Sequence, residues 1–374
     1  MPLRLLVAAV GIALVLPLQA LAAPPHPEAG SYLVVNASTG EVLAARNPRA
    51  RVPIASITKL MTVLVALEHA RLTDVVRVDR AAAKVGESTI RLRAGERITV
   101  HDLVAAALIQ SANDAAVALA RHVGHGSTPA FVALMNAKAH ELGLRDTHFV
   151  RPDGLDARGE FSSAADVVKL AEVAMHDPTI RRIVGERTAT IAGNRRLVTW
   201  DDLLGTFPGL IGVKTGHTDN AGWCQVAAVR GMGLTIYTAI LGSPSRSRRN
   251  ADLAALLAWG LSRYRVVPLV QAGRTYARAE IGYGRAPVAL VAERPLIRSV
   301  RLGQPFVERV VAPAVLSLPV KAGQALGEVR VYRNGELFGS RRLVAAGSAR
   351  RPGLTGRVGW YAGQTVHHIW GWVT

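Results

Sequence analysis

The spacing of apolar residues changes along this chain, and the change limits the fold more than any other feature. Tyr32–Val35 and Val42–Ala45 surround the turn-like segment Ala37–Gly40 and predict a hairpin. In several later segments apolar residues recur every three or four positions, which indicates helices. The helices are expected to begin near Ser56 and Asp114 and to cover Thr99–Ile109, Thr128–Leu142 and Ser163–Met175.

From Leu210 onward the pattern is extended rather than helical. Strands are expected at Leu210–Lys214, Cys224–Val229 and Leu234–Leu241, followed by a helix over Ala251–Leu261. An early hairpin, a block of helices and a late run of strands together predict layers of α-helix and antiparallel β-sheet. We expect this domain to occupy residues 28–264.

Beyond Val267-Pro268 no helical period is visible, and short apolar runs alternate with Gly and Pro. Residues 268–348 are therefore expected to form a small all-β domain, in which Arg333-Asn334-Gly335-Glu336 makes a hairpin turn. A tail, residues 350–374, contains four aromatic residues and one helical apolar face. Tryptophan favours bilayer interfaces, so this tail is expected to touch a membrane surface, with a packed or frayed terminus as the alternative. The better strand candidates are Val288–Val291, Val310-Val311, Val315–Leu318 and Val329–Tyr332.

The chain is basic because of arginine: the formal charge is +18, and only six of its 374 residues are lysine. Such a charge suits an anionic surface such as phospholipid or cell-wall polymer. The arginines are scattered and no nucleic-acid-binding signature occurs, so nucleic acid is not expected as a partner.

The first 22 residues resemble a signal peptide. A short basic start precedes an apolar run from Leu5 to Leu18, and Ala20-Leu21-Ala22 offers a small-x-small cleavage pattern. A retained N-terminal anchor is the alternative. We therefore expect an exported protein, in a periplasm or on the outer face of a cytoplasmic membrane. Cys224 is the single cysteine, so no internal disulfide is possible, and its apolar strand favours a core position over a reactive thiol.

Ser56 and Lys59 lie three residues apart at the start of an apolar helix. This spacing places both side chains on one helical face, near the positive end of the helix dipole. A hydroxyl beside an amine is a possible activated nucleophile, although a serine there also suits a helix cap.

Two further short elements make the nucleophile interpretation stronger. They are Ser111-Ala112-Asn113 and Lys214-Thr215-Gly216. From this composition chance supplies about 0.03 copies of Lys-Thr-Gly, so the element is informative. Each could be structural on its own, as caps or as an exposed strand lysine.

Together these residues provide what acyl transfer needs: a nucleophile, a base, a donor for the leaving group and an oxyanion site. Lys59 can be the base if burial and the charge of Lys214 lower its pKa. Ser111 can relay a proton, and Asn113 can hold a substrate amide. Lys214 and Thr215 suit a carboxylate, and the bare Gly216 lets a substrate approach the backbone.

The three elements resemble those of the low-molecular-mass penicillin-binding proteins that act as D-alanyl-D-alanine carboxypeptidases. The segment from Lys214 to Gly222 carries the resemblance further, and it extends over about residues 32–261. It implies an α/β catalytic domain of the penicillin-binding/β-lactamase type, an antiparallel sheet with helices on both sides. It also implies that Ser56 is acylated, that the backbone N–H groups of Ser56 and His217 form the oxyanion hole, and that Arg249 binds a carboxylate.

Two departures from the family pattern concern loops. The usual Asn-Pro-x-Gly-Leu is Arg151-Pro152-Asp153-Gly154-Leu155 here, and Asp201 or Asp202 replaces the asparagine before Leu203-Leu204. Both affect the expected substrate preference more than the reaction type.

The resemblance implies a serine DD-carboxypeptidase that removes the terminal D-alanine of peptidoglycan stem peptides and is acylated by β-lactams, without a cofactor or a catalytic metal. The alternatives are a DD-endopeptidase that cuts crosslinks, a β-lactamase, and a non-catalytic wall-binding protein. A β-lactamase of class A would need a deacylating glutamate between the second and third elements, and none there has the required Glu-x-x-Leu-Asn pattern. The glutamates between the second and third elements are Glu141, Glu160, Glu172 and Glu186.

The dispersed histidines, including the surface pair His367-His368, predict no metal site.

Overall fold

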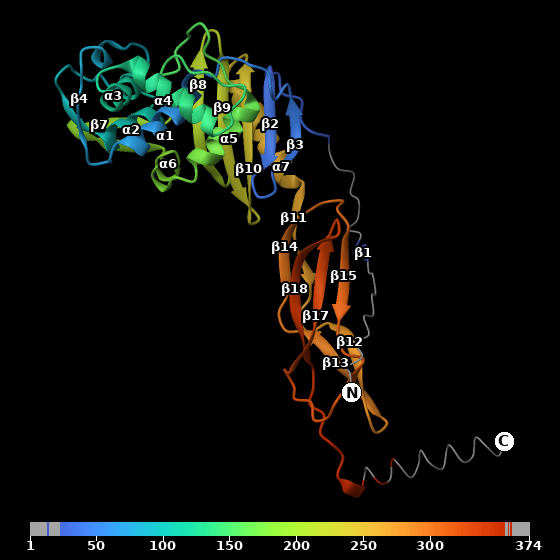
Figure 1. The fold of residues 1–374 in the computed structure, drawn as a ribbon. Coiled ribbons are helices and arrows are strands. Elements are labelled where there is room, and N and C mark those ends of the chain that lie inside the picture. Colours follow the sequence, from blue (N-terminus) through green and yellow to red (C-terminus); the bar gives the residue numbers. More distant parts are fainter. Residues whose placement is uncertain (1–12, 15–22, 356–357, 359, 361–374) are drawn as a thin grey trace. The chain divides into compact units, whose positions relative to one another are not determined.

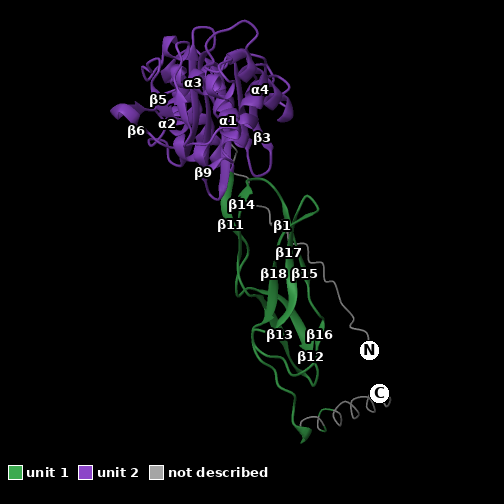
Figure 2. Cartoon of the chain, turned by 60° about the vertical axis from the view of Figure 1, so that its left-hand side comes forward, with its two compact units in different colours: residues 1–21, 264–374 green, residues 22–263 purple. Residues whose placement is uncertain are grey.

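The computed structural model describes residues 13–14, 23–355, 358 and 360. It divides into two compact units, one over residues 22–263 and the other over residues 1–21 and 264–374 (Figure 2). The predicted signal peptide lies outside the described residues, apart from strand β1 (Ala13–Leu14), and so does most of the predicted membrane-contacting tail, with His367 and His368. No helix among the described residues combines the length and apolar character needed to cross a bilayer.

The unit over residues 22–263 is built on one five-stranded antiparallel sheet in the order β3-β2-β10-β9-β8. The predicted hairpin pairs with the last strand of the predicted late run, so the two ends of the unit meet in one sheet (Figure 1). The fold-class prediction of an antiparallel sheet is confirmed. The strands are β2 (Ser31–Asn36), β3 (Glu41–Arg46), β8 (Leu210–Thr218), β9 (Gly222–Gly231) and β10 (Leu234–Ser243).

Helices cover both faces of this sheet, as the fold class requires. On one face Gly260 of α7 (Arg246–Ser262) lies so close that an added Cβ would be 3.2 Å from Ile236 and 3.3 Å from Val34. On the other face the alternate residues Leu33 and Tyr237 join the large helical core. That core is made with helices α1 (Lys59–His69), α2 (Val100–Leu108), α3 (Asn113–Val123), α4 (Thr128–Glu141), α5 (Ala164–Ala174) and α6 (Pro178–Ile183).

Side-chain caps fix several helix starts. Thr99 accepts a hydrogen bond from the Asp102 N–H at 3.1 Å, and Ser163 accepts one from Asp166 at 3.2 Å. The predicted last helix began at Ala251, which is wrong by five residues: Ser245 caps α7, accepting from the Arg248 N–H at 3.1 Å. Its first turn is polar, so apolar spacing alone did not find it.

Smaller elements surround the helical core. Two antiparallel two-stranded sheets flank it, and neither pairing was predicted. These elements are η1 (Ala55–Thr58), η2 (Ala82–Lys84), η3 (Ala192–Asn194), β4 (Val75–Arg77), β5 (Arg97–Thr99), β6 (Thr188–Ile191) and β7 (Arg195–Val198).

The other unit is all-β, as predicted. A seven-stranded sheet has the order β1-β15-β17-β18-β13-β12-β16, and β11 pairs with β14. Val329, Val331 and Leu343 are fully buried in its separate core. The predicted turn is present, with Arg333 opposite Glu336 and Asn334 and Gly335 at positive φ. The strands are β11 (Tyr264–Val270), β12 (Thr275–Ile281), β13 (Arg285–Ala292), β14 (Leu296–Arg301), β15 (Phe306–Val311), β16 (Val315–Leu316), β17 (Ala325–Arg333) and β18 (Glu336–Ala345).

Candidate active site

Ser56 lies in the tight turn η1, directly before helix α1. Ala55 has a φ of 49°, a conformation that costs free energy for a residue with a Cβ. Two glycines fit against this turn. A Cβ on Gly154 would lie 2.2 Å from the Ala55 carbonyl oxygen, and a Cβ on Gly216 would lie 2.9 Å from the Ser56 nitrogen. Neighbouring backbone segments therefore hold the nucleophile turn in its shape.

Gly216 was predicted to be bare so that a substrate could approach the strand. The structure gives a different reason. The missing side chain would point at the Ser56 turn, 2.9 Å from both the Ile54 oxygen and the Ser56 nitrogen. The glycine lets strand β8 pack directly on the nucleophile turn.

The amine of Lys59 is fully buried and makes three hydrogen bonds. It donates to Ser56 Oγ at 2.7 Å, to Asn113 Oδ1 at 2.7 Å and to the Asp153 carbonyl oxygen at 2.6 Å. Burial lowers its pKa to about 8, against the opposing influence of Asp153, Glu160 and more distant carboxylates. An amine with this pKa is partly neutral near pH 8 and can accept a proton from a hydroxyl that it already touches.

The second and third elements meet at a hydrogen bond between Lys214 and Ser111. Lys214 Nζ donates to Ser111 Oγ at 2.8 Å and to the Thr215 carbonyl oxygen at 2.8 Å. Burial, followed by the charge of Lys59, lowers the pKa of Lys214 well below its ordinary value. The pKa of Lys59 is lowered in the predicted direction by burial, but the predicted effect of the Lys214 charge is not among its causes; the charge effect acts instead from Lys59 on the pKa of Lys214.

Ser111 and Asn113 lie at the start of helix α3, where Asn113 is held by the segment that contains Gly86 and Ser88. Ser111 has a φ of 62°, so its backbone is strained for a non-glycine residue. Asn113 donates through Nδ2 to the Gly86 carbonyl oxygen at 3.1 Å, and its N–H donates to the Ser88 carbonyl oxygen at 2.7 Å. These contacts fix the Asn113 carbonyl oxygen toward Lys59.

A cavity of about 240 Å³ lies over these residues. His217 stacks on Trp223 at one wall, with ring centroids 4.1 Å apart. The structure thus brings the predicted Ser56, Ser111, Thr215, Gly216, His217 and Arg249 to one cavity, with Lys59, Asn113 and Lys214 in the hydrogen-bonded layer behind it. Three further lining residues, Ser88, Trp200 and Trp223, were not predicted as site residues.

Arg249 reaches this cavity from helix α7, and only 1% of its surface is exposed. Its guanidinium lies 5.6 Å from the Trp223 ring centroid, donates to Asn250 Oδ1 at 2.6 Å and is 3.7 Å from Asp202. Burial lowers the pKa of Arg249, although the guanidinium stays charged because its ordinary pKa is so high. It therefore brings a positive charge to the wall beside Thr215.

The loop that departs from the family pattern supplies a structural ion pair. Asp153 is fully buried and pairs with Arg151, which donates at 2.9 Å through Nε and 2.8 Å through Nη2. The same residue gives its backbone carbonyl to Lys59. The Arg151 and Asp153 side chains thus compensate each other while the backbone positions the amine.

Other candidates take structural places. Cys224 is fully buried, and burial raises the pKa of its thiol to about 11, which fits the expected core role. Of the four glutamates considered for deacylation, Glu160 lies nearest the nucleophile turn, but it accepts from Thr58 Oγ1 at 3.0 Å and from the N–H groups of Val150 and Arg151. No glutamate is among the described residues that line the Ser56 cavity. No cluster of potential metal ligands occurs within the described ranges either.

Comparison with known proteins agrees with this geometry. A family model described as D-alanyl-D-alanine carboxypeptidase matches residues 19–245. The chain is 33% identical to the D-alanyl-D-alanine carboxypeptidase DacD of Salmonella typhimurium, over 90% of each chain. It is 30% identical to DacF of Bacillus subtilis, over 87% of each.

Solved structures give the same result. Penicillin binding protein 5 from Haemophilus influenzae matches 88% of this chain and 100% of its own, with a TM-score of 0.65 and 27% identity. The Streptomyces K15 DD-transpeptidase matches 64% of this chain and 100% of its own, with a TM-score of 0.61 and 30% identity. The chain therefore belongs to the D-alanyl-D-alanine carboxypeptidase family of serine peptidases.

Proposed function

We propose that Ser56 is the acylated nucleophile of this DD-carboxypeptidase and Lys59 its general base. The single observation that carries the proposal is the 2.7 Å contact between Lys59 Nζ and Ser56 Oγ, made by a fully buried amine whose pKa is lowered to about 8. Such an amine can take the hydroxyl proton as Ser56 attacks the carbonyl carbon of the last D-alanyl peptide bond.

The negative oxygen that forms in this step needs donors. The backbone N–H groups of Ser56 and His217 are proposed to supply them, because strand β8 packs directly on the Ser56 turn. Gly216 allows this close packing. Asn113 is proposed to hold the substrate amide while its carbonyl oxygen orients Lys59.

The leaving D-alanine must receive a proton and lose its contacts. Ser111 is proposed to pass the proton to the departing amine, since its hydroxyl lies between the cavity and the amine of Lys214 at 2.8 Å. Thr215 and Arg249 are proposed to bind the terminal carboxylate, because both line the same cavity and Arg249 supplies a buried positive charge. Water then cleaves the ester of Ser56, with Lys59 again available as base.

The substrate is proposed to be a peptidoglycan stem peptide that ends in D-Ala-D-Ala, and β-lactams are proposed to acylate Ser56 as carbonyl analogues. We also propose that the enzyme is exported, in a periplasm or on the outer face of a cytoplasmic membrane, because its first 22 residues have the pattern of a signal peptide. Contact of residues 350–374 with a membrane surface stays a prediction from the tryptophans of the tail.

Release of D-alanine tests the proposal. A purified form without residues 1–22 should release free D-alanine from a monomeric pentapeptide. Ser56→Ala should release none, whereas the exposed-turn variant Ser38→Ala should match the wild type. A wild-type protein that binds peptidoglycan but releases no D-alanine would be a wall-binding protein. Rapid turnover of penicillin would instead indicate a β-lactamase.

A further inference from the structure

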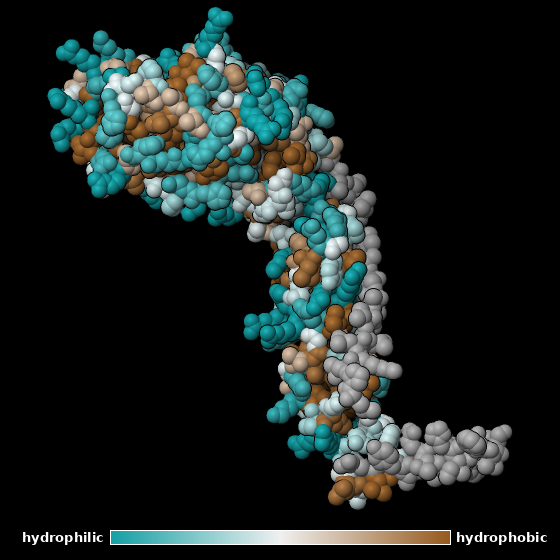
Figure 3. All heavy atoms as spheres, in the orientation of Figure 1, coloured by the Kyte–Doolittle hydropathy of each residue, from teal (hydrophilic) through white to brown (hydrophobic). Residues whose placement is uncertain are grey.

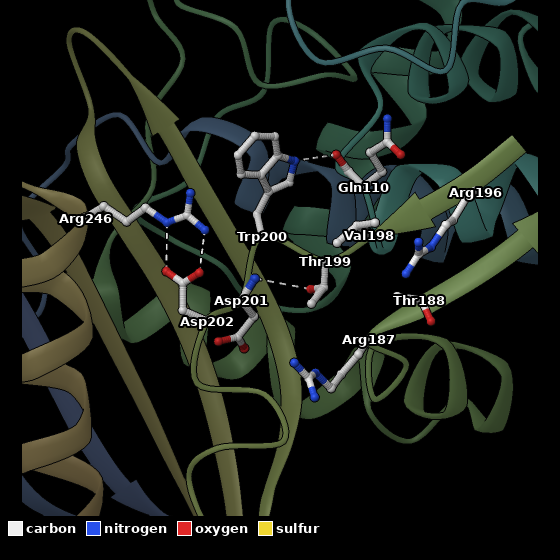
Figure 4. Close-up of a pocket in the computed structure, with 10 residues that line it drawn as sticks. All are labelled: Gln110, Arg187, Thr188, Arg196, Val198, Thr199, Trp200, Asp201, Asp202 and Arg246. Atoms are coloured by element: carbon white, nitrogen blue, oxygen red, sulfur yellow. Dashed lines mark hydrogen bonds and ion pairs between the residues drawn. The ribbon is translucent and has the colours of Figure 1, made fainter.

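A cavity of about 260 Å³ lies where helices α5 and α6 meet strands β8, β9 and β10. We call it the Glu172 cavity, after the carboxylate at its border. It shares no lining residue with the Ser56 cavity, or with the larger cavity of about 880 Å³ beside Trp200 that Figure 4 shows. Pockets for drug-sized ligands span about 300–1,000 Å³, so this one suits a smaller molecule.

The sheet forms one side of the Glu172 cavity. Arg230 of β9 lies directly opposite Thr235 of β10, so the two side chains are on the same face of the sheet. Tyr237, two residues further along β10, is on that face as well. Strand β8 adds Ile211, which is the extra residue of a β-bulge. The sheet therefore brings a guanidinium, two hydroxyls and an aliphatic side chain to one space.

Tyr237 is the most deeply buried polar residue of this wall, with only 6% of its surface exposed. Burial raises the pKa of its phenol to about 12, so the hydroxyl stays neutral and can donate a hydrogen bond. Buried tyrosine hydroxyls usually find a partner, but this one makes no hydrogen bond to any residue that the structure describes. The cavity thus holds a donor that a bound molecule can satisfy.

The helical side of the cavity carries its negative charge. Glu172 of α5 is half-buried, and burial raises the pKa of its carboxyl, with His176 one turn further on acting in the opposite direction. Among the described residues this carboxylate has no hydrogen-bonding or ion-pair partner. Arg181 of α6 donates to the Met175 carbonyl oxygen at 3.2 Å, whereas the guanidinium of Arg230 has no partner within the described ranges.

The larger cavity beside Trp200 shows the usual arrangement of opposite charges. There Arg246 donates to both carboxylate oxygens of Asp202, and the two side chains compensate each other (Figure 4). In the Glu172 cavity, Glu172 and Arg230 border one space without pairing, as far as the described residues show. A half-buried carboxylate without a partner costs free energy. A ligand with two opposite charges would compensate both residues at once.

We propose that the Glu172 cavity binds a free α-amino acid, with its ammonium group on Glu172 and its carboxylate on Arg230. The Tyr237 hydroxyl donates to the same carboxylate, and Met175 and Ile211 pack against the aliphatic side chain. A simple anion would leave Glu172 without a partner, and a simple cation would leave Arg230 without one. A metal ion fits poorly, since the described residues hold no cluster of three potential ligands.

The test is isothermal titration calorimetry on the purified protein, with and without penicillin bound at Ser56. The probes are the D and L forms of leucine and alanine, isocaproate, which is leucine without its ammonium group, and isoamylamine, which is leucine without its carboxylate. Each is titrated into the wild type, Glu172→Gln, Arg230→Gln, Tyr237→Phe and the exposed control Arg49→Gln. Penicillin labelling of each variant verifies that it is folded.

Leucine should bind the wild type whether or not penicillin is present, and isocaproate and isoamylamine should bind at least about tenfold more weakly, the value of one charge-assisted hydrogen bond. Glu172→Gln and Arg230→Gln should each weaken leucine binding by a similar factor, and Tyr237→Phe by roughly two- to tenfold. Arg49→Gln should match the wild type. Because isocaproate has no ammonium group, Glu172→Gln should not weaken its binding.

The two enantiomers distinguish the source of the ligand. Tighter binding of the D forms would support the proposal with the D-alanine released at Ser56 as a ligand, and tighter binding of the L forms would support it with another amino acid. Binding that penicillin abolishes would place the amino acid in the Ser56 cavity and overturn the proposal. So would the absence of binding, equal binding of leucine and isocaproate, or leucine binding that neither Glu172→Gln nor Arg230→Gln weakens.

Discussion

The two units differ in how many of their charged side chains are buried. The described residues of the α/β unit bury nine charged side chains, among them Lys59, Asp153, Lys214 and Arg249. Those of the β unit bury only Glu308. Yet residues 264–351 contain fifteen Lys and Arg against five Glu and no Asp, a net charge of +10. Basic composition therefore does not locate chemistry in this chain.

The difference follows from the cost of removing charge from water. A buried charge is costly unless partners compensate it, so its presence indicates a structural or chemical use. In the α/β unit the partners are specific: Asp114, for instance, accepts from the N–H groups of Ile90, Leu92 and Ala115. In the β unit the arginines remain at the surface, where hydrophilic side chains are prominent (Figure 3). Function should thus respond to the few buried charges and not to the many exposed ones.

Replacing one lysine in each unit with methionine should give the largest difference between the two units. Lys59→Met keeps the side-chain volume but removes the base, and the rate of acylation by a labelled penicillin should fall by about 10²–10⁴-fold. Lys321→Met in the β unit removes an exposed lysine and should leave the rate unchanged. Equal rates for the two variants in a gel-based labelling time course would show that buried charge does not identify the base.

Two substitutions of Ser111 separate the role of its hydroxyl from that of its strained backbone. Ser111→Ala and Ser111→Gly should both slow D-alanine release on the order of 10²-fold, because both lose the group that contacts Lys214. Glycine tolerates the φ of 62°, so the glycine variant should be more stable than the alanine variant by about 1 kcal/mol in denaturant unfolding. If Ser111→Gly remained fully active, the serine would be a turn residue only.

The pH dependence of acylation should report the buried amine. Lys59 acts as base only when neutral, so the rate should rise about tenfold per pH unit below its pKa of about 8 and level off above it. The pKa of Lys59 lies below its ordinary value of 10.5 because burial disfavours the charged amine. Stopped-flow rates between pH 6 and 10 measure this limb. A rise that continued to pH 10 would mean that the amine is exposed to water during the reaction.

The smallest effect is expected at the surface of the β unit. Arg309 lies directly opposite Arg330 across two strands, and its guanidinium is 4.9 Å from the Tyr332 ring centroid. Arg309→Gln removes a like-charge repulsion and a cation–π contact of similar size, so the free energy of unfolding should change by less than about 0.5 kcal/mol. Penicillin acylation should not change. A loss of acylation at this position would mean that the exposed charges of the β unit serve the active site.

Sequence patterns predicted the parts of the site that are local. Ser56 and Lys59 share one turn, and Lys214, Thr215 and Gly216 share one strand, so spacing alone relates their positions. The hairpin, the late strands and the all-β unit were predicted for the same reason, since their periods are short.

The contacts that complete the site depend on distant segments. Trp200 and Trp223 line the cavity from separate segments, and no spacing rule connects them to Ser56. The strained φ of Ser111 and the packing of Gly216 on the Ser56 turn also arise only in the folded chain. The β6–β7 hairpin was missed because its strands are only four residues each, too short for an alternating pattern to stand out.

The account depends above all on Ser56 as the residue that becomes acylated. The most direct measurement is digestion of the penicillin-treated protein followed by mass spectrometry of the modified peptide. We predict one penicillin per chain, bound at Ser56, and no adduct in Ser56→Ala. An adduct at Ser111 or at any other residue, or a labelled Ser56→Ala protein, would contradict the account.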